Sequence, residues 1–425
     1  MIKPSAAQLK EKFFHPGFQR YFQNTGWMFF GQAFNMAVAF FVGAYVARYL
    51  GPANFGLMSY AISFASLFGF LAGLGIDNIL NRELIKYPEN RKDLLGTGFW
   101  LKILGAALAV TIIGSVSSLI NYHGLTRLLI LIYASTFFSQ SLVITALYFQ
   151  AQVLSRKVIR AQLIMTIIST AAKLAVIYLG GGVIWLTAVY ILDSLAYGLG
   201  LIIIYRKSGN QWFFNSFKLN LAKSILRDSW PLMLTAAAVT IYSKIDQVFI
   251  KGMLGDAAVG LYAVPAKLTE IFNFIPAIIC ASLFPALINA KKDSKNYGLR
   301  LKRLVVMIGV ISIATAIIAS LAARPLIVWL FGPAYIQSIT IFRIYIWSIV
   351  PSFIMVVANY YLIAENLTRT YLAVTAIGAI TNIALNLYLI PRLGMPGGAL
   401  ATLISYSLVM VSLALFPGVW RNLRQ

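Results

Sequence analysis

Apolar segments of about twenty residues follow one another along almost the whole chain, and this feature limits its possible folds more than any other. Twelve segments can be distinguished, at 24–47, 57–77, 98–120, 127–150, 161–180, 182–204, 230–253, 259–288, 303–323, 338–363, 371–391 and 398–418. A helix rises ~1.5 Å per residue, so about 20 residues cross a hydrocarbon layer ~30 Å thick. Only 11% of the residues are charged, too few for a water-facing surface. The sequence therefore predicts an all-α membrane protein with about twelve spans.

The positions of Lys and Arg predict how these spans are oriented. With the N-terminus in the cytoplasm, 25 of the 35 Lys and Arg residues fall on the inner side, five on the outer side and five within spans. Cytoplasmic loops retain cations, so we expect both termini inside and an even number of spans. The same placement explains the net charge of +23 without nucleic-acid binding, because the cations lie in short loops between apolar segments.

An internal repeat divides the chain into two halves. The segment Leu50–Leu57 (LGPANFGL) recurs 204 residues later as Leu254–Leu261 (LGDAAVGL), and each copy links the first two spans of its half. We therefore expect two pseudo-symmetric six-helix bundles, at 24–204 and 230–418, related by an axis along the membrane normal and flanking a central cavity. The remaining segments are cytoplasmic tails at 1–23 and 419–425.

The linker between the two bundles, at 205–229, mixes basic and aromatic residues. Such a segment is predicted to lie as an amphipathic helix in the cytoplasmic headgroup layer. A solvated connector is the alternative.

Ten charged residues, including Lys102 and Asp77, fall inside the spans or near their ends, where charge is costly, and the other eight are candidate site residues. The cations are Arg48, Lys173, Lys244, Lys267 and Arg343, and the acids are Asp193, Asp246 and Glu270. A charge near the bilayer centre costs at least ~2.5–3.5 kcal/mol, so these side chains should face a partner or a wet interior. Their positive excess favours an anionic substrate. We interpret the cations as substrate-binding groups, and the acids as groups that balance charge or carry a coupling proton.

Structural ion pairs are the alternative interpretation of these charges. Lys267 and Glu270 lie three residues apart on one helix face and could hold each other. Asp246 lies two residues from Lys244 and should point to another side of the helix. For Lys244 and Lys173 we favour a position facing the cavity.

The span at 259–288 is long and contains Pro265, Pro276 and Pro285. Proline removes a backbone donor and bends a helix. The span is either the flexing element of a transport cycle or an example of the proline that membrane helices tolerate.

The sequence offers no residues for a cofactor, a metal or covalent catalysis. Its one cysteine, Cys280, cannot form an intramolecular disulfide, and the two histidines, His15 and His123, are far apart. A phosphate-binding loop of the ATPase type is also missing. We therefore expect a transporter rather than an enzyme, driven by an ion gradient, by the substrate's own gradient or by another subunit.

Several short motifs resemble those of a known group of transporters. They are Ala47–Gly56, Leu74–Asp77, Lys244–Asp246 and Phe331–Tyr335, and they resemble the polysaccharide-exporter branch of the multidrug/oligosaccharidyl-lipid/polysaccharide (MOP) superfamily. The likeness runs along the whole chain. It implies a twelve-span flippase of the bacterial inner membrane that moves undecaprenyl-pyrophosphate-linked oligosaccharide repeat units for O-antigen or capsule assembly.

The resemblance also implies partners and site roles. Lys and Arg of the cavity would pair with phosphate oxygens, H⁺ or Na⁺ would be the coupling ion, and a polysaccharide polymerase and a chain-length regulator would act nearby. Two alternatives stay open. One is a drug/cation antiporter of the same superfamily, which would need a mainly acidic cavity. The other is a membrane glycan polymerase or ligase, which would need large outer loops.

Overall fold

The computed structural model describes residues 16–120, 122, 124–289, 294–365 and 367–413. Within these ranges every regular element is a helix. The longer helices are α2 (Pro16–Ser66), α5 (Arg91–Leu119), α6 (Gly124–Gln140), α8 (Ser155–Tyr178), α9 (Val183–Lys207), α10 (Leu219–Leu254), α11 (Asp256–Phe272), α12 (Phe274–Asn289), α13 (Ser294–Leu321), α16 (Ile349–Ala364), α17 (Thr368–Leu393) and α18 (Met395–Ser412). The shorter ones are α3 (Gly69–Gly73), α4 (Asp77–Lys86), η1 (Pro88–Asn90), η2 (Ser141–Ile144), α7 (Thr145–Ala151), α14 (Ala323–Phe331), η4 (Pro333–Tyr335), α15 (Ser338–Tyr345) and η5 (Ile346–Ser348).

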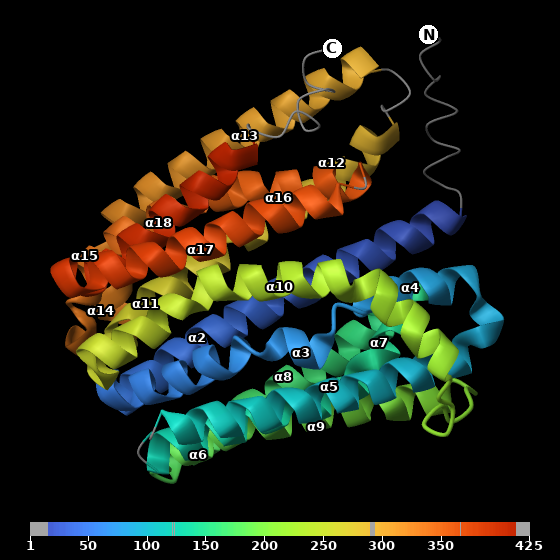
Figure 1. The fold of residues 1–425 in the computed structure, drawn as a ribbon, viewed down its shortest axis with the longest axis horizontal. Helices are drawn as coiled ribbons and strands as arrows, with labels where there is room; N and C mark the ends of the chain where they lie inside the picture. Colours follow the sequence, from blue (N-terminus) through green and yellow to red (C-terminus); the bar gives the residue numbers. More distant parts are fainter. Residues whose placement is uncertain (1–15, 121, 123, 290–293, 366, 414–425) are drawn as a thin grey trace.

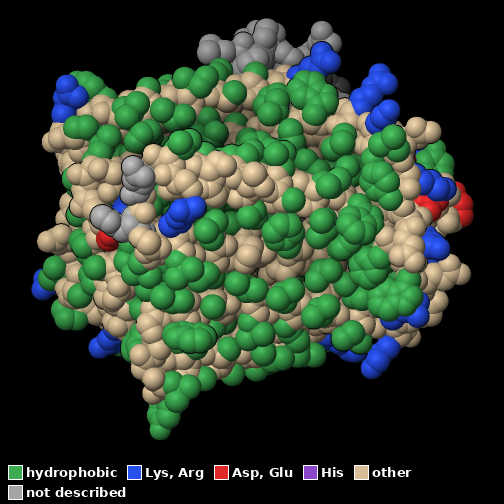
Figure 2. Space-filling model, turned by 60° about the horizontal axis from the view of Figure 1, so that its bottom comes forward, with side chains coloured by type: hydrophobic (Ala, Val, Ile, Leu, Met, Phe, Trp, Pro, Cys, Tyr) green, Lys and Arg blue, Asp and Glu red, His purple; other side chains and the backbone are tan. Residues whose placement is uncertain are grey.

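The long helices run roughly along one axis, as spans of a bilayer must (Figure 1). Ten segments of the described residues are long and apolar enough to cross a membrane. Apolar side chains cover the middle of the face in Figure 2, and most Lys and Arg side chains lie at its two ends. We call the end that contains the turn at Gly255 the outer end (left in Figure 1), after the predicted orientation. The chain is thus a multi-pass membrane protein.

Several predicted spans differ in detail from the structure. The segment 57–77 is not one helix, because α2 ends at Ser66, α3 is short and α4 begins at Asp77. The segment 259–288 divides into α11 and α12 at Asn273. Pro276 explains this break, since it cannot donate to the carbonyl of Phe272. The segment 230–253 lies within the 36-residue helix α10, whose charged residues make it more polar than the ten apolar segments.

Two sets of helices correspond to the two predicted halves. α6 packs against α5 and α9, and α9 against α8, whereas α17 packs against α10 and α18. The two sets meet where α11 and α10 contact α2. In Figure 1 the α12, α13 and α16–α18 helices lie above this contact, and α5, α8 and α9 lie below it.

The repeated glycines form the tightest contact between the two sets. A Cβ atom added to Gly56 would overlap the carbonyl oxygen of Asp256, and one added to Gly260 would overlap the carbonyl oxygen of Pro52. Gly260 follows Gly56, and Asp256 follows Pro52, at the repeat offset of 204, so the contact is reciprocal, as a local twofold axis requires. Small residues allow such close approach of membrane helices. We call this contact the glycine crossing.

The two turns that lead into the glycine crossing also match. Gly51 has φ 68° and Gly255 has φ 86°, a backbone conformation that glycine adopts without steric cost. The first bends α2, and the second separates α10 from α11.

The predicted amphipathic helix at 205–229 is wrong in its first part. Residues 208–218 are not helical, and this stretch packs against α5. Phe213 is buried, with its ring centroid 6.2 Å from that of Phe99. Trp100 Nε1 donates a hydrogen bond to the carbonyl oxygen of Phe214 at 2.7 Å. Phe213 and Phe214 therefore bind the protein, whereas Trp212 and Phe217 are exposed. From Leu219 the linker continues as the first turns of α10.

Candidate functional site

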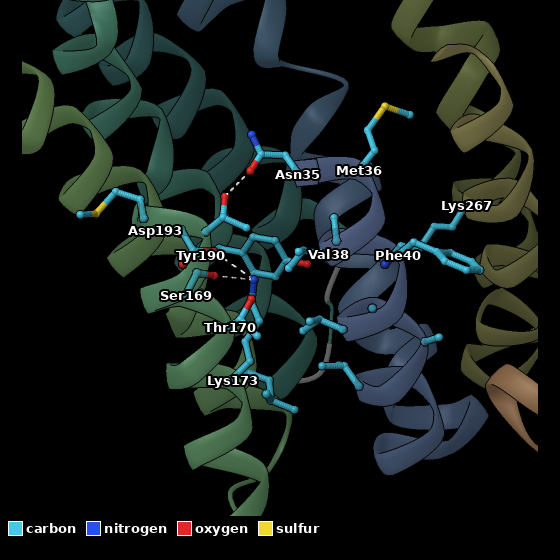
Figure 3. A pocket seen from close by; sticks show the side chains of 18 of the residues that line it. Asn35, Met36, Val38, Phe40, Ser169, Thr170, Lys173, Tyr190, Asp193 and Lys267 are labelled. Carbon is cyan, nitrogen blue, oxygen red and sulfur yellow. Dashed lines mark hydrogen bonds and ion pairs between the residues drawn. The ribbon is translucent and has the colours of Figure 1, made fainter. Parts of the chain in front are cut away.

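A cavity of about 640 Å³ lies between α2, α6, α8, α9 and α11. Its wall is largely apolar, but it contains two cations and two carboxylates. These are Lys173 on α8, Asp193 on α9, and Lys267 and Glu270 on α11. Figure 3 shows Lys173 and Lys267 reaching the cavity from helices on opposite sides of it. α11 thus brings charges of the second half of the chain to a cavity formed mainly by the first half.

Lys173 is held in place by groups on its own and the adjacent helix. Its Nζ donates hydrogen bonds to Asp193 Oδ2 at 3.0 Å and to Ser169 Oγ at 2.9 Å. The ring of Tyr190 lies 5.0 Å from the same nitrogen. This side chain is already paired, so it forms a fixed, neutralised part of the wall.

In the described part of the chain, Lys267, the second cation that lines the cavity, lacks the carboxylate partner that Lys173 has. Within the described residues, no carboxylate oxygen lies within 4 Å of its ammonium group. The Nζ atom lies 4.7 Å from the centroid of the Phe55 ring, a cation–π contact. Lys267 is therefore a positive charge that faces the cavity without a counter-ion.

Glu270 lies between two cavities. It lines the large cavity and also a second one of about 220 Å³, which is walled by polar residues of the second half, including Ser243, Asn273 and Ser352. Its carboxylate pairs with Lys244. The alternative pairing of Lys267 with Glu270 is therefore wrong, because the carboxylate turns toward α10 instead.

Four predicted site residues lie outside both cavities. Lys244 lines neither of them and pairs with Glu270, contrary to its predicted position facing the cavity. Arg48 and Arg343 are exposed, and neither lines a cavity. Asp246 is 1% exposed. It accepts hydrogen bonds from Tyr262 Oη, from Thr402 Oγ1 at 3.3 Å and from the backbone nitrogen of Gln247 at 2.8 Å. This carboxylate joins α10 to α11 and α18, on another side of α10 from Lys244, as its spacing predicts.

The charge balance of the cavity follows from these positions. Two cations (Lys173 and Lys267) and two carboxylates (Asp193 and Glu270) line the cavity. Asp193 pairs with Lys173, and Glu270 pairs with Lys244, which lies outside the lining. One positive charge is left over, and it belongs to Lys267. In a partly dehydrated site, such a charge attracts anions more strongly than it would in water.

Uncharged amides also line the cavity, and the search for charges in the sequence missed them. They are Asn35 on α2, Gln140 on α6 and Gln162 on α8. The signal that could have revealed them is an amide inside an apolar span. It is weaker than a charge, since an amide is less costly to bury.

The fold and the cavity can now be compared with known proteins. The model of the polysaccharide biosynthesis protein family matches residues 21–291, more than half of the 425 residues. The chain belongs to this family. A second model, named MatE, matches residues 231–388. The polysaccharide-exporter resemblance found in the sequence is thus confirmed.

Two known proteins share modest identity with the chain. An Lsg locus protein of Haemophilus influenzae is 22% identical over 323 residues, which are 75% of this chain and 78% of that protein. A Haloferax volcanii protein named "Probable flippase AglR" is 27% identical over 262 residues. That match covers 57% of this chain and about half (51%) of the relative.

Two solved structures have a fold similar to that of this chain. An inward-facing MATE family multidrug resistance transporter of the MOP superfamily is 14% identical, with a TM-score of 0.75 over 90% of this chain and 93% of that one. The lipid II flippase MurJ in an inward closed conformation is 16% identical, with a TM-score of 0.74 over 91% and 87%. At these identities the likeness establishes the architecture, which agrees with the predicted twelve-span fold in two halves.

Proposed function

We propose that this chain is a flippase that moves undecaprenyl-pyrophosphate-linked oligosaccharide repeat units from the inner to the outer leaflet of the bacterial inner membrane. The uncompensated charge of Lys267 in the cavity is the observation that supports this most directly. A pyrophosphate is anionic, its sugars are polar, and its lipid stays in the bilayer. A polar cavity with one unpaired cation, inside an apolar bundle, suits such a substrate.

In the proposed cycle the head group enters from the cytoplasmic side while the glycine crossing closes the outer end. Lys267 pairs with phosphate oxygens, and the Lys173–Asp193 and Lys244–Glu270 pairs keep the rest of the wall nearly neutral. Binding that is too tight would prevent release, so one free cation is better suited to transport than several. The halves then rock about the site and open the outer end.

The energy source in this proposal is an H⁺ or Na⁺ gradient. Glu270 is the preferred coupling group because it lines both cavities, with Asp193 and the buried Asp246 as further candidates. The products would serve O-antigen or capsule synthesis, with a polymerase and a chain-length regulator as partners.

A drug/cation antiporter is the second candidate, because the MatE model matches residues 231–388. It is less well supported, since both cavity carboxylates are paired with lysines and the charge of Lys267 would repel a cationic drug.

Substituting Lys267 tests the proposed function. In proteoliposomes, Lys267→Ala should weaken the apparent affinity for the lipid-linked oligosaccharide about 10- to 150-fold, because a hydrogen bond to a charged group is worth ~1.5–3 kcal/mol. Lys267→Arg should retain most of the activity. The measurement is the rate at which the glycan becomes accessible to a membrane-impermeant reagent in the opposite leaflet.

Arg343→Ala is the matched control, since it removes an exposed cation outside both cavities. It should leave the rate unchanged. Equal losses of flipping rate in the Lys267 and Arg343 variants would contradict the proposal. So would a wild type that flips no lipid-linked oligosaccharide, together with a Lys267→Ala variant that transports a cationic dye faster.

A further inference from the structure

Three amides line the cavity at one depth, nearer the inner end than the charged groups. Asn35 precedes the kink at Gly51 by sixteen residues, Gln140 follows Gly124 by sixteen, and Gln162 precedes Tyr178 by sixteen. Each therefore lies about 24 Å along its helix from the outer end. We call these three residues the amide tier.

The charged groups lie closer to the outer end, at several depths. Lys173 is five residues from the outer end of α8, and Lys267 is eleven residues from the start of α11, which places them about 8 Å and 17 Å from that end. Figure 3 shows Asn35 and Lys173 at opposite ends of the pocket. Glu270 lies fourteen residues from the start of α11, about 3 Å short of the depth of the amide tier. The charged groups thus extend from the outer part of the cavity to its middle, and the amide tier lies at their inner limit.

Asn35 has hydrogen-bonding capacity to spare. Its Oδ1 accepts a hydrogen bond from Thr166 Oγ1 at 2.6 Å, which fixes the amide plane. Its Nδ2 is buried and has no partner within the described residues. An unpaired buried donor is unfavourable, so a ligand that supplies an acceptor here would be bound more tightly than one that does not.

The other two amides are also available. Gln140 is exposed to the cavity, and its Nε2 makes a long hydrogen bond of 3.4 Å to Thr136 Oγ1. Gln162 lines the cavity from α8, next to Thr166 on the following turn. Three amides from three helices therefore line the cavity at a similar depth.

Amides suit sugars for a chemical reason. Each carries a donor and an acceptor in one plane, as neighbouring hydroxyl groups do, and none carries a charge that would hold a phosphate. The amide tier lies about 7 Å further in than Lys267 along the helices, a separation that the first sugar rings next to a pyrophosphate would span.

We propose that Asn35, Gln140 and Gln162 form a subsite for the sugars next to the pyrophosphate, and that this subsite selects the glycan while Lys267 holds the phosphate. The proposal rests on the proposed function and deepens it. Charge and glycan recognition are then carried by different residues and can be separated by experiment.

Binding of two probes to the purified protein tests this division. The probes are undecaprenyl pyrophosphate and undecaprenyl-pyrophosphate-linked N-acetylglucosamine. The wild type should bind the sugar-bearing probe more tightly than the bare one. Asn35→Leu, Gln140→Met and Gln162→Met should each reduce this preference about three- to tenfold, while affinity for the bare probe changes less than about twofold. Lys267→Ala should weaken both probes alike.

Gln32→Met is the matched control, because Gln32 is an exposed amide one turn before Asn35 on α2 and does not line the cavity. Thermal unfolding in detergent verifies that every variant is folded. The subsite is refuted if the wild type shows no preference for the sugar, or if the amide variants weaken both probes equally. If the bare probe does not bind, and Lys267→Ala does not change the affinity for the sugar-bearing probe, the proposed function is refuted instead.

Discussion

At the scale of single residues, depth in the membrane was predictable from sequence and rotation about the helix axis was not. Counting from the turns placed Lys267 and Lys244 within the bundle. It could not show that Glu270 turns from Lys267 toward Lys244, because either partner is compatible with the spacing. Arg343 was misplaced for the same reason, since it is exposed rather than in the cavity.

The Lys173–Asp193 pair allows a test at this scale. Asp193→Asn leaves a partly buried ammonium group without a counter-charge, since the Lys173 side chain is 18% exposed. Loss of one partner of such a pair destabilises the fold by up to about 3 kcal/mol. The melting temperature of the purified protein should fall.

The double variant Lys173→Met/Asp193→Asn should recover most of the lost stability, because it removes the unpaired charge as well. A double variant that melts no higher than Asp193→Asn alone would show that the pair does not stabilise the wall in this way.

At the scale of the elements, apolar length predicted where the chain crosses the membrane but not where its helices break. Pro276 was recognised as a cause of bending, and the division of α11 from α12 at Asn273 follows from it. The break around Leu67–Phe68 had no such signal, since no proline lies within four residues after it. The linker was misassigned because buried and lipid-facing aromatic residues look alike in a sequence.

The glycine crossing makes its own prediction for the elements. Gly56→Ala and Gly260→Ala should separate α2 from α11 at the outer end, because each new methyl group would overlap a backbone carbonyl. A shift of about 1 kcal/mol toward the outward-open state changes its population roughly fivefold. The test labels Val42→Cys, a residue of the cavity wall, in a protein that also carries Cys280→Ser. An impermeant maleimide added from the outer side should label this cysteine faster, in proportion to the population of the outward-open state.

Gly252→Ala is the matched control for this experiment, since a Cβ at Gly252 meets no atom within 4 Å. Unchanged labelling in both crossing variants, with normal folding, would show that the contact does not close the outer end.

At the scale of the whole molecule, twelve spans in two related halves were predictable from segment length and one repeated octapeptide. The cavity was predicted between the halves, but helices of the first half form most of its wall. Sequence periodicity cannot reveal this asymmetry, because it depends on how closely α11 approaches α2.

The orientation of the molecule is a further prediction. In right-side-out vesicles lacking Cys280, an impermeant maleimide should label Tyr178→Cys, at the exposed outer end of α8, and should reach Trp212→Cys in the linker only after permeabilisation. This follows from the excess of Lys and Arg on the linker side. The reverse labelling pattern would overturn the inside location of both termini.

The glycine crossing brings main chain against main chain, and no polar or charged side chain takes part at its centre. In the proposed cycle this contact closes the outer end without any side chain that would recognise the substrate. Under that proposal, Gln162 or Lys267 can be exchanged to suit another glycan or another head group without changing the contact that closes the outer end. Selectivity and conformational change would then be separable in a redesign of this chain.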